Sequence, residues 1–138
     1  MDIANKKVEE IEGIGPSYGA KLTEAGIKDT DTLLDQGKTK KGRSDIAEKT
    51  GISEKMILGW VNMADLFRIT GVAGEYAELL EASGVDTVKE LRNRNAANLA
   101  AKMVEVNEAK NLTRQVPSES MCEKWIEEAK TLDPMVSH

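Results

Sequence analysis

The sequence predicts an all-α protein made of two tandem copies of one helical unit, packed together into one compact structure. Apolar residues recur at helical spacing, and the segments between them are rich in Gly, Ser, Thr and Asn. No segment of about four to eight residues alternates apolar and polar side chains with β-branched enrichment, as a strand would. The chain also matches itself at two sequence offsets, which is typical of an internal repeat.

The internal repeat is indicated by two matching glycine-containing segments and by two tryptophans at equivalent positions. An offset of 58 residues aligns residues 11–14 (IEGI) with residues 69–72 (ITGV). An offset of 65 residues aligns Trp60 with Trp125. Because the same features recur in the same order and such short repeats seldom bury their apolar faces alone, we expect the two copies to pack against each other.

The two offsets differ by seven residues, which indicates an insertion in the second copy, within residues 104–116. We therefore divide the chain into a first repeat at residues 1–65, a second and degenerate repeat at residues 66–133, and a tail at residues 134–138. The tail follows an Asp-Pro pair that ends the last helix, so we expect it to be frayed, with its histidine in solvent.

Helix signals fall in the same order in both copies. Pro16 fits the first position of a helix, and Gly26 fits the position just past a helix end. Ser53 and Asn95 can cap helices, and Thr87 begins a capping box. The helix that follows Ser53 is expected to join the two copies rigidly. The expected helices lie at residues 3–11, 16–25, 30–36, 44–50, 53–69, 74–83, 87–92, 95–107 and 118–132.

Composition limits the class of protein. Of the 138 residues, 40% are hydrophobic and 31% are charged, which is typical of a globular chain and not of a disordered one. The formal net charge is −5, and the second copy carries most of it. A protein that binds nucleic acid through its overall charge is normally basic, so any contact with nucleic acid has to be local.

Cysteine content and the start of the sequence bear on cofactors and location. Cys122 is the single cysteine, so neither an intramolecular disulfide nor a thiolate cluster for a metal can form. The sequence contains no signal-peptide run and no stretch of about eighteen apolar residues. We expect a cytoplasmic protein with no cofactor, no metal and no membrane contact. Because no catalytic triad or nucleotide fingerprint is present, we expect a binding protein and not an enzyme with a small-molecule substrate.

Residues 11–22 (IEGIGPSYGAKL) carry the most specific motif. Gly13 and Gly15 allow a tight reversal between two helices, Ile14 fills the core, and Gly19 lets the helices approach closely. This order of hydrophobic residues and glycines resembles the helix-hairpin-helix motif of SAM-like folds. The resemblance implies two tandem helix-hairpin-helix repeats, with the turn binding a nucleic-acid backbone phosphate without sequence preference. In the family a monovalent cation sometimes sits at the hairpin carbonyls.

The chemistry of the turn agrees with anion binding, because a set of outward amides at a helix start favours an anion. The amides that can point outward together belong to Gly13, Ile14, Gly15, Ser17 and Tyr18. Lys21, one turn into the helix, matches a position where the family often carries a basic residue. The alternative interpretation is that the hairpin only joins two helices, and the acidic balance of the chain favours that alternative.

Residues 37–44 (GKTKKGRS) hold the one concentrated set of cations, which we expect in a loop before a helix. The cations are Lys38, Lys40, Lys41 and Arg43. The segment differs by one residue from a nucleotide-binding P-loop, but a P-loop requires a preceding β-strand and here a helix is expected. We interpret the segment as a second contact to backbone phosphate; the alternative is a solvated connector.

The second hairpin departs from the motif. Ala73 replaces the second glycine, Glu75 and Glu78 add negative charge, and Leu79 stands at the position of Lys21. These changes would repel a phosphate and remove the basic side chain, so we expect no phosphate binding there. The second hairpin is interpreted as a pseudo-symmetric scaffold.

Over nearly its whole length the chain resembles a bacterial family that is known only as a domain of unknown function (4332). This resemblance implies the tandem fold and transfers no activity. The residues that carry it are 58–66 (LGWVNMADL), 68–72 (RITGV), 75–80 (EYAELL), 84–88 (GVDTV), 94–100 (RNAANLA) and 116–118 (VPS).

Two functions remain open. The leading hypothesis is a DNA-binding module that grips the backbone with residues 13–17, Lys21 and residues 38–43. The alternative is a protein-interaction or scaffolding module that uses the helical faces around Trp60 or Trp125, without nucleic acid. Both tryptophans lie on apolar stripes, which favours anchors in a core or interface over base-stacking platforms.

Overall fold

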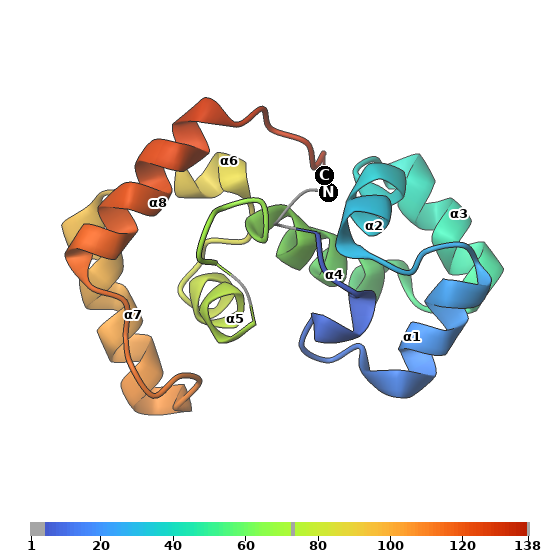
Figure 1. Cartoon of the computed structure of the whole chain (residues 1–138), viewed down its shortest axis with the longest axis horizontal. Helices are drawn as coiled ribbons and strands as arrows, with labels where there is room; N and C mark the ends of the chain where they lie inside the picture. The colour runs from blue at the N-terminus through green and yellow to red at the C-terminus, as the bar shows by residue number, and fades with distance from the viewer. Residues whose placement is uncertain (1–4, 73, 138) are drawn as a thin grey trace.

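The computed structural model describes residues 5–72 and 74–137 (Figure 1). In this part of the chain all regular elements are helices, which confirms the all-α prediction. The one exception among the described residues is an isolated antiparallel bridge between Lys7 and Asp29. No helix there is long and apolar enough to cross a membrane. The predictions about Ala73 and His138 concern positions outside the described residues. The helices are the 3-10 helix η1 (Val8–Glu10), α1 (Gly15–Glu24), α2 (Thr30–Gly37), α3 (Lys40–Thr50), α4 (Glu54–Leu66), α5 (Glu75–Ala82), α6 (Val88–Leu91), α7 (Ala96–Lys110) and α8 (Glu119–Thr131).

Side-chain caps of the same kind begin helices at equivalent positions of the two copies. The side chain of Asp29 accepts from the amide three residues on at 2.8 Å and begins α2, and Thr87 does the same at 3.2 Å and begins α6. Ser53 and Ser118 begin α4 and α8, each with a bond of 3.2 Å. Each cap satisfies an amide that has no partner within the helix, so these polar residues fix where the helices begin.

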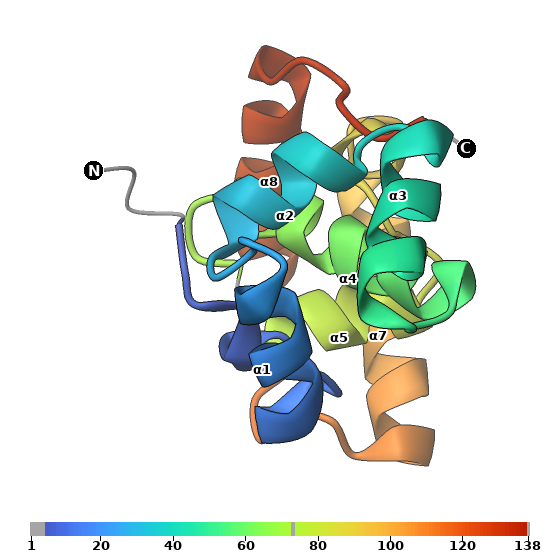
Figure 2. The same cartoon turned by 90° about the vertical axis from the view of Figure 1, so that its right-hand side faces the viewer.

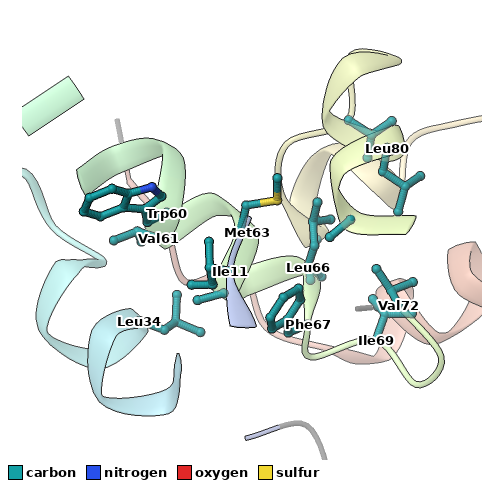
Figure 3. Close-up of a cluster of buried hydrophobic side chains, with 14 of the residues drawn as sticks. Ile11, Leu34, Trp60, Val61, Met63, Leu66, Phe67, Ile69, Val72 and Leu80 are labelled. Carbon is teal, nitrogen blue, oxygen red and sulfur yellow. The ribbon is translucent and has the colours of Figure 1, made fainter. Parts of the chain in front are cut away.

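One hydrophobic core runs through both copies, and α4 lies in the middle of it. Residues 60–67 are all buried, so nearly two turns of this helix face protein on every side. Figure 3 shows Leu34 of α2 near the first part of α4 and Leu80 of α5 near its end. The helix therefore packs against elements from both parts of the chain, and its last residue, Leu66, lies beyond the boundary that we placed after residue 65.

A buried carboxylate fixes the second copy to the end of α4. Asp65 is 1% exposed and accepts from the Arg68 guanidinium at 2.8 Å and from the Val88 amide at 2.8 Å. The Val88 amide is the first of α6, so this bond caps a helix across the molecule. Arg68 also donates to the carbonyl oxygen of Asp133 at 2.8 Å, which places the start of the C-terminal segment.

The predicted helix at residues 3–11 is wrong within the described residues. Here the chain is extended before the short helix η1, because its backbone groups bond to a distant segment. The Thr30 amide donates to the Lys6 carbonyl at 2.7 Å, and the Val8 amide donates to the Lys28 carbonyl at 3.1 Å. These bonds satisfy groups that a helix would have paired locally.

The predicted frayed tail is also wrong. The Ser137 amide donates to the Lys38 carbonyl at 2.8 Å, and the Arg43 guanidinium donates to the Ser137 carbonyl at 2.7 Å. Met135 and Val136 are half-buried against the core. The C-terminal segment thus returns to the first copy, where Figures 1 and 2 show it close to α2 and the start of α3.

Candidate nucleic-acid interface

The first hairpin connects η1 to α1 and has the backbone geometry of a tight turn. Gly13 and Gly15 have φ values of +94° and +63°, which L side chains rarely adopt. Ile11 and Ile14 are each 1% exposed and anchor the turn in the core. Gly13 and Ser17 are exposed, so the second copy does not cover the turn.

The amides of the turn differ in what they can bind. The Ile14 amide donates to the Ile11 carbonyl at 3.2 Å, so Ile14 contributes through its buried side chain and not as the ligand donor that we expected. The amides of Gly15 and Ser17 lie in the first turn of α1, where a helix offers no partner, and no side chain caps this helix. An acceptor on another molecule can therefore bond to these two amides.

Tyr18 and Lys21 are held against the same turn. The Tyr18 ring packs on the Trp60 ring with centroids 5.3 Å apart, and a Cβ on Gly13 would lie 3.9 Å from Trp60 Nε1. The Lys21 ammonium lies 5.9 Å from the Tyr18 ring centroid. This cation–π contact places the charge of Lys21 near Tyr18, on the outer face of α1.

The second hairpin repeats this packing. The Tyr76 and Trp125 ring centroids are 5.6 Å apart, and a Cβ on Gly71 would lie 3.7 Å from Trp125 Nε1. Trp60 and Trp125 are 7% and 4% exposed and belong to the core. The prediction that both tryptophans are buried anchors and not base-stacking platforms is confirmed, and neither indole is available to a partner.

The charge at the second hairpin is different. The Thr70 amide donates to the two carboxylate oxygens of Glu128 at 3.2 and 3.1 Å, and the Thr70 hydroxyl donates to one of them at 3.2 Å. An anionic group of the chain itself therefore sits at this turn. At the offset of 65 residues, the position of Glu128 corresponds to Met63 in the first copy, which carries no charge.

A cavity of about 380 Å³ opens beside the first hairpin, on the side of the second copy. Burial, and then the charges of Glu12 and Glu75, raise the pKa of Glu78. Burial, and then the charges of Asp86 and Glu78, raise the pKa of Glu81. The cavity is lined by Glu12, Gly13, Met63, Glu78, Glu81, Ala82, Lys110 and Leu112. The sequence did not predict this cavity, because Glu12 is far along the chain from Glu78 and Glu81. Since these carboxylates repel an anion, an anion at the turn is favoured only on the side of α1.

The segment of residues 38–43 is not the loop that we predicted. Helix α2 ends at Gly37, and α3 already begins at Lys40. Thr39 caps α3 by accepting from the Gly42 amide at 3.0 Å. A Cβ on Gly42 would overlap the carbonyl oxygen of Gln36, so a glycine is needed where the two helices meet. The glycine that looked like a loop residue is therefore required by close packing.

The four cations of this segment have different surroundings. Arg43 is 4% exposed and donates to the carbonyl oxygens of Gly37 at 2.9 Å and Ser137 at 2.7 Å. We correct its predicted role as a surface phosphate contact, because both terminal nitrogens bind backbone within the folded chain. Lys38 is half-buried and pairs with Asp35 at 3.5 Å, whereas Lys40 and Lys41 are exposed.

The structure does not bring this segment to the first hairpin. Figures 1 and 2 show the start of α3 near the C-terminal segment and the hairpin at the other end of the first copy. The opposite end of α3 meets α1, where Lys21 and Lys49 line a groove of about 540 Å³ together with Glu24. Lys49 was not among the predicted residues, because it stands alone in the sequence and only packing places it beside Lys21.

The comparisons with known proteins gave one finding. Residues 12–132 match the family described as a domain of unknown function (DUF4332). No curated protein and no solved structure matched the chain. The matched residues include both hairpins and every helix from α1 to α8. Because the match covers most of its length, the chain belongs to the family of the domain of unknown function DUF4332.

Proposed function

We propose that this protein is a nucleic-acid-binding module of two tandem helix-hairpin-helix repeats, and that its first hairpin holds a backbone phosphate of DNA. The observation that carries the proposal is the first turn, where Gly13 and Ser17 are exposed and the Gly15 and Ser17 amides begin α1 without a side-chain cap. The Lys21 ammonium lies 5.9 Å from the ring centroid of Tyr18, which belongs to the first part of α1. Phosphates carry no sequence information, so this contact has no base preference.

The repeat assignment is supported by equivalent backbone geometry in the two copies. Gly13 and Gly71 have φ values of +94° and +86°, and Gly26 and Gly84 have φ values of +88° and +94°. The two Tyr–Trp pairs add the same packing under each turn. Among the described residues, no carboxylate is recorded on the amides of the first turn as Glu128 is on Thr70, so we assign the phosphate contact to the first copy alone.

The remaining cations supply secondary contacts in this proposal. Lys21 and Lys49 share a groove along α1, and Lys40 and Lys41 lie further away at the start of α3. A DNA strand that crosses the first copy would meet these two groups in succession. The helix C-termini and Glu24 at the groove weaken its attraction for phosphate, so Lys21 and the turn provide the main contact.

A titration of labelled DNA at several salt concentrations tests the proposal. Two to four phosphate contacts predict a slope of about −2 to −4 for log affinity against log salt. Lys21→Gln should make this slope shallower by about 1, since it removes one ionic contact. The matched control is Lys124→Gln, an exposed lysine on α8, which should leave the slope unchanged. Equal salt slopes for the two variants would remove Lys21 from the interface.

A second candidate is a protein-interaction module, and the acidic cavity beside the hairpin favours it. Glu12, Glu78 and Glu81 line this cavity with Lys110 as the one cation among its lining residues, and the chain carries a net charge of −5. A basic side chain of a protein partner would fit such a site electrostatically. If DNA does not bind and an arginine-rich peptide protects Glu78 and Glu81 amides from hydrogen exchange, this candidate replaces the first.

A further inference from the structure

The C-terminal residues 133–137 form a strap between the two copies. At its start, the Asp133 carbonyl accepts from Arg68 at 2.8 Å. At its end, the amide and hydroxyl of Ser137 both donate to the Lys38 carbonyl, at 2.8 and 3.2 Å. Two half-buried apolar side chains, Met135 and Val136, lie between these contacts. The strap is thus held by backbone bonds and a small apolar contact.

The strap covers the guanidinium of Arg43. One terminal nitrogen of Arg43 donates to the Ser137 carbonyl at 2.7 Å, and the other donates to the Gly37 carbonyl at 2.9 Å. Both acceptors are uncharged, and burial lowers the pKa of the guanidinium. A guanidinium forms stronger and more specific bonds with an oxyanion than with a neutral carbonyl. The Ser137 oxygen therefore occupies a position that suits an oxygen of a phosphate.

We propose that the strap is an autoinhibitory contact: when it dissociates, Arg43 becomes accessible beside Lys40 and Lys41 and binds a second backbone phosphate. This inference rests on the proposed function, and it assigns to Arg43 a role in the released state only. Ordering the strap costs conformational entropy, which its few contacts must offset. Nucleic acid that binds the released state better than the strapped state would shift the equilibrium toward release.

Release of the strap can be measured without DNA. Ser137→Pro removes the amide N–H that bonds to Lys38, whereas the matched control Ser137→Ala removes only the hydroxyl. Phenylglyoxal labelling of arginine followed by mass spectrometry reports the accessibility of Arg43, with the exposed Arg114 as internal reference. We expect several-fold faster labelling of Arg43, relative to Arg114, in Ser137→Pro and little change in Ser137→Ala. Unchanged labelling of Arg43 in Ser137→Pro would contradict the proposal that the strap controls access to Arg43.

The second part of the test measures phosphate binding. In Ser137→Pro the slope of log DNA affinity against log salt should steepen by about 0.9, which corresponds to one additional phosphate contact. Arg43→Gln in the Ser137→Pro background should return the slope to the wild-type value. If Arg43 becomes accessible and the slope does not change, the phosphate role of Arg43 is wrong while the hairpin proposal stands. If wild-type and variant both fail to bind DNA, the proposed function fails, whereas the labelling still decides whether the strap covers Arg43.

Discussion

Gly13 tests the geometry of the first turn at the scale of a single residue. Gly13→Ala should lower the free energy of unfolding by about 1–2 kcal/mol, because a Cβ is disfavoured at its φ of +94°. Space is not the cause, since the nearest atom to that Cβ is Trp60 Nε1 at 3.9 Å. Gly59→Ala is the matched control: it lies in α4 with no atom within 4 Å, and it should stabilise by roughly 0.5–1 kcal/mol. Urea unfolding of both variants measures these values, and a loss of the same size at Gly59 would contradict the turn geometry.

Cys122 tests burial through the pH dependence of stability. Burial raises the pKa of its thiol to about 11, above the value of about 8.5 in an unfolded chain. The folded state therefore holds the proton more tightly, and this contribution is complete below about pH 8.5 and declines as the pH rises to about 11, by about 1.4 kcal/mol per unit. The difference in unfolding free energy between the wild type and Cys122→Ala isolates the thiol, because all other groups titrate in both proteins. A difference in unfolding free energy that stays constant across this pH range would show that the thiol is not buried.

Glu78 tests the electrostatics beside the hairpin. Its carboxylate lines the cavity with Gly13 and has a raised pKa from burial and from Glu12. Glu78→Gln should strengthen DNA binding at neutral pH by about two- to fivefold, which corresponds to the roughly 0.5–1 kcal/mol of a partly screened charge pair. The gain should shrink as the pH falls through the raised pKa of Glu78. The exposed Glu123 on α8 provides the control variant Glu123→Gln, and an equal gain there would indicate a general charge effect only.

At the scale of helices, the buried carboxylate of Asp65 joins α4 to α6. Asp65→Ala should lower the free energy of unfolding by about 3–5 kcal/mol, because it leaves Arg68 without its anion and the first amide of α6 without its cap. The pair Lys130–Glu127 has exposed side chains, so Lys130→Ala should cost less than about 1 kcal/mol. Urea unfolding of the two variants measures the contrast. A small cost at Asp65 would mean that α6 is held by apolar packing alone.

Helix positions could be predicted wherever the signal is local. The caps at Ser53, Thr87 and Asn95 each lie at the start of a helix, as the sequence predicted. The exceptions have distant causes. Lys6 pairs with Thr30 and Val8 pairs with Lys28, so this segment does not form a helix. Gly42 marks a helix contact where the sequence indicated a loop. Such contacts leave no periodic pattern in one sequence, so local reasoning cannot find them.

At the scale of the whole molecule, the sequence predicted an all-α protein and the tight turn at Gly13 and Gly15, but not what surrounds that turn. Gly13 and Gly15 could be predicted because a tight reversal needs glycines at fixed spacing, whereas Lys21 came from the resemblance to the helix-hairpin-helix motif. The acidic cavity was not found, because Glu81 meets Glu12 only after the copies pack. Lys49 and the strap were missed for the same reason. The different charges of the two hairpins could be read from the sequence. The hydrogen bond from the Thr70 amide to Glu128 could not be predicted, because the two residues lie far apart in the chain.

Amide chemical shifts measured during a DNA titration test the central claim most directly, because they report on each backbone N–H separately. We expect the amide signals of Gly15 and Ser17 to shift in a salt-dependent way, while the signal of Thr70, whose amide already bonds to Glu128, does not shift. Shifts that occur only in the second copy, or an absence of shifts at the first turn at low salt, would contradict the account.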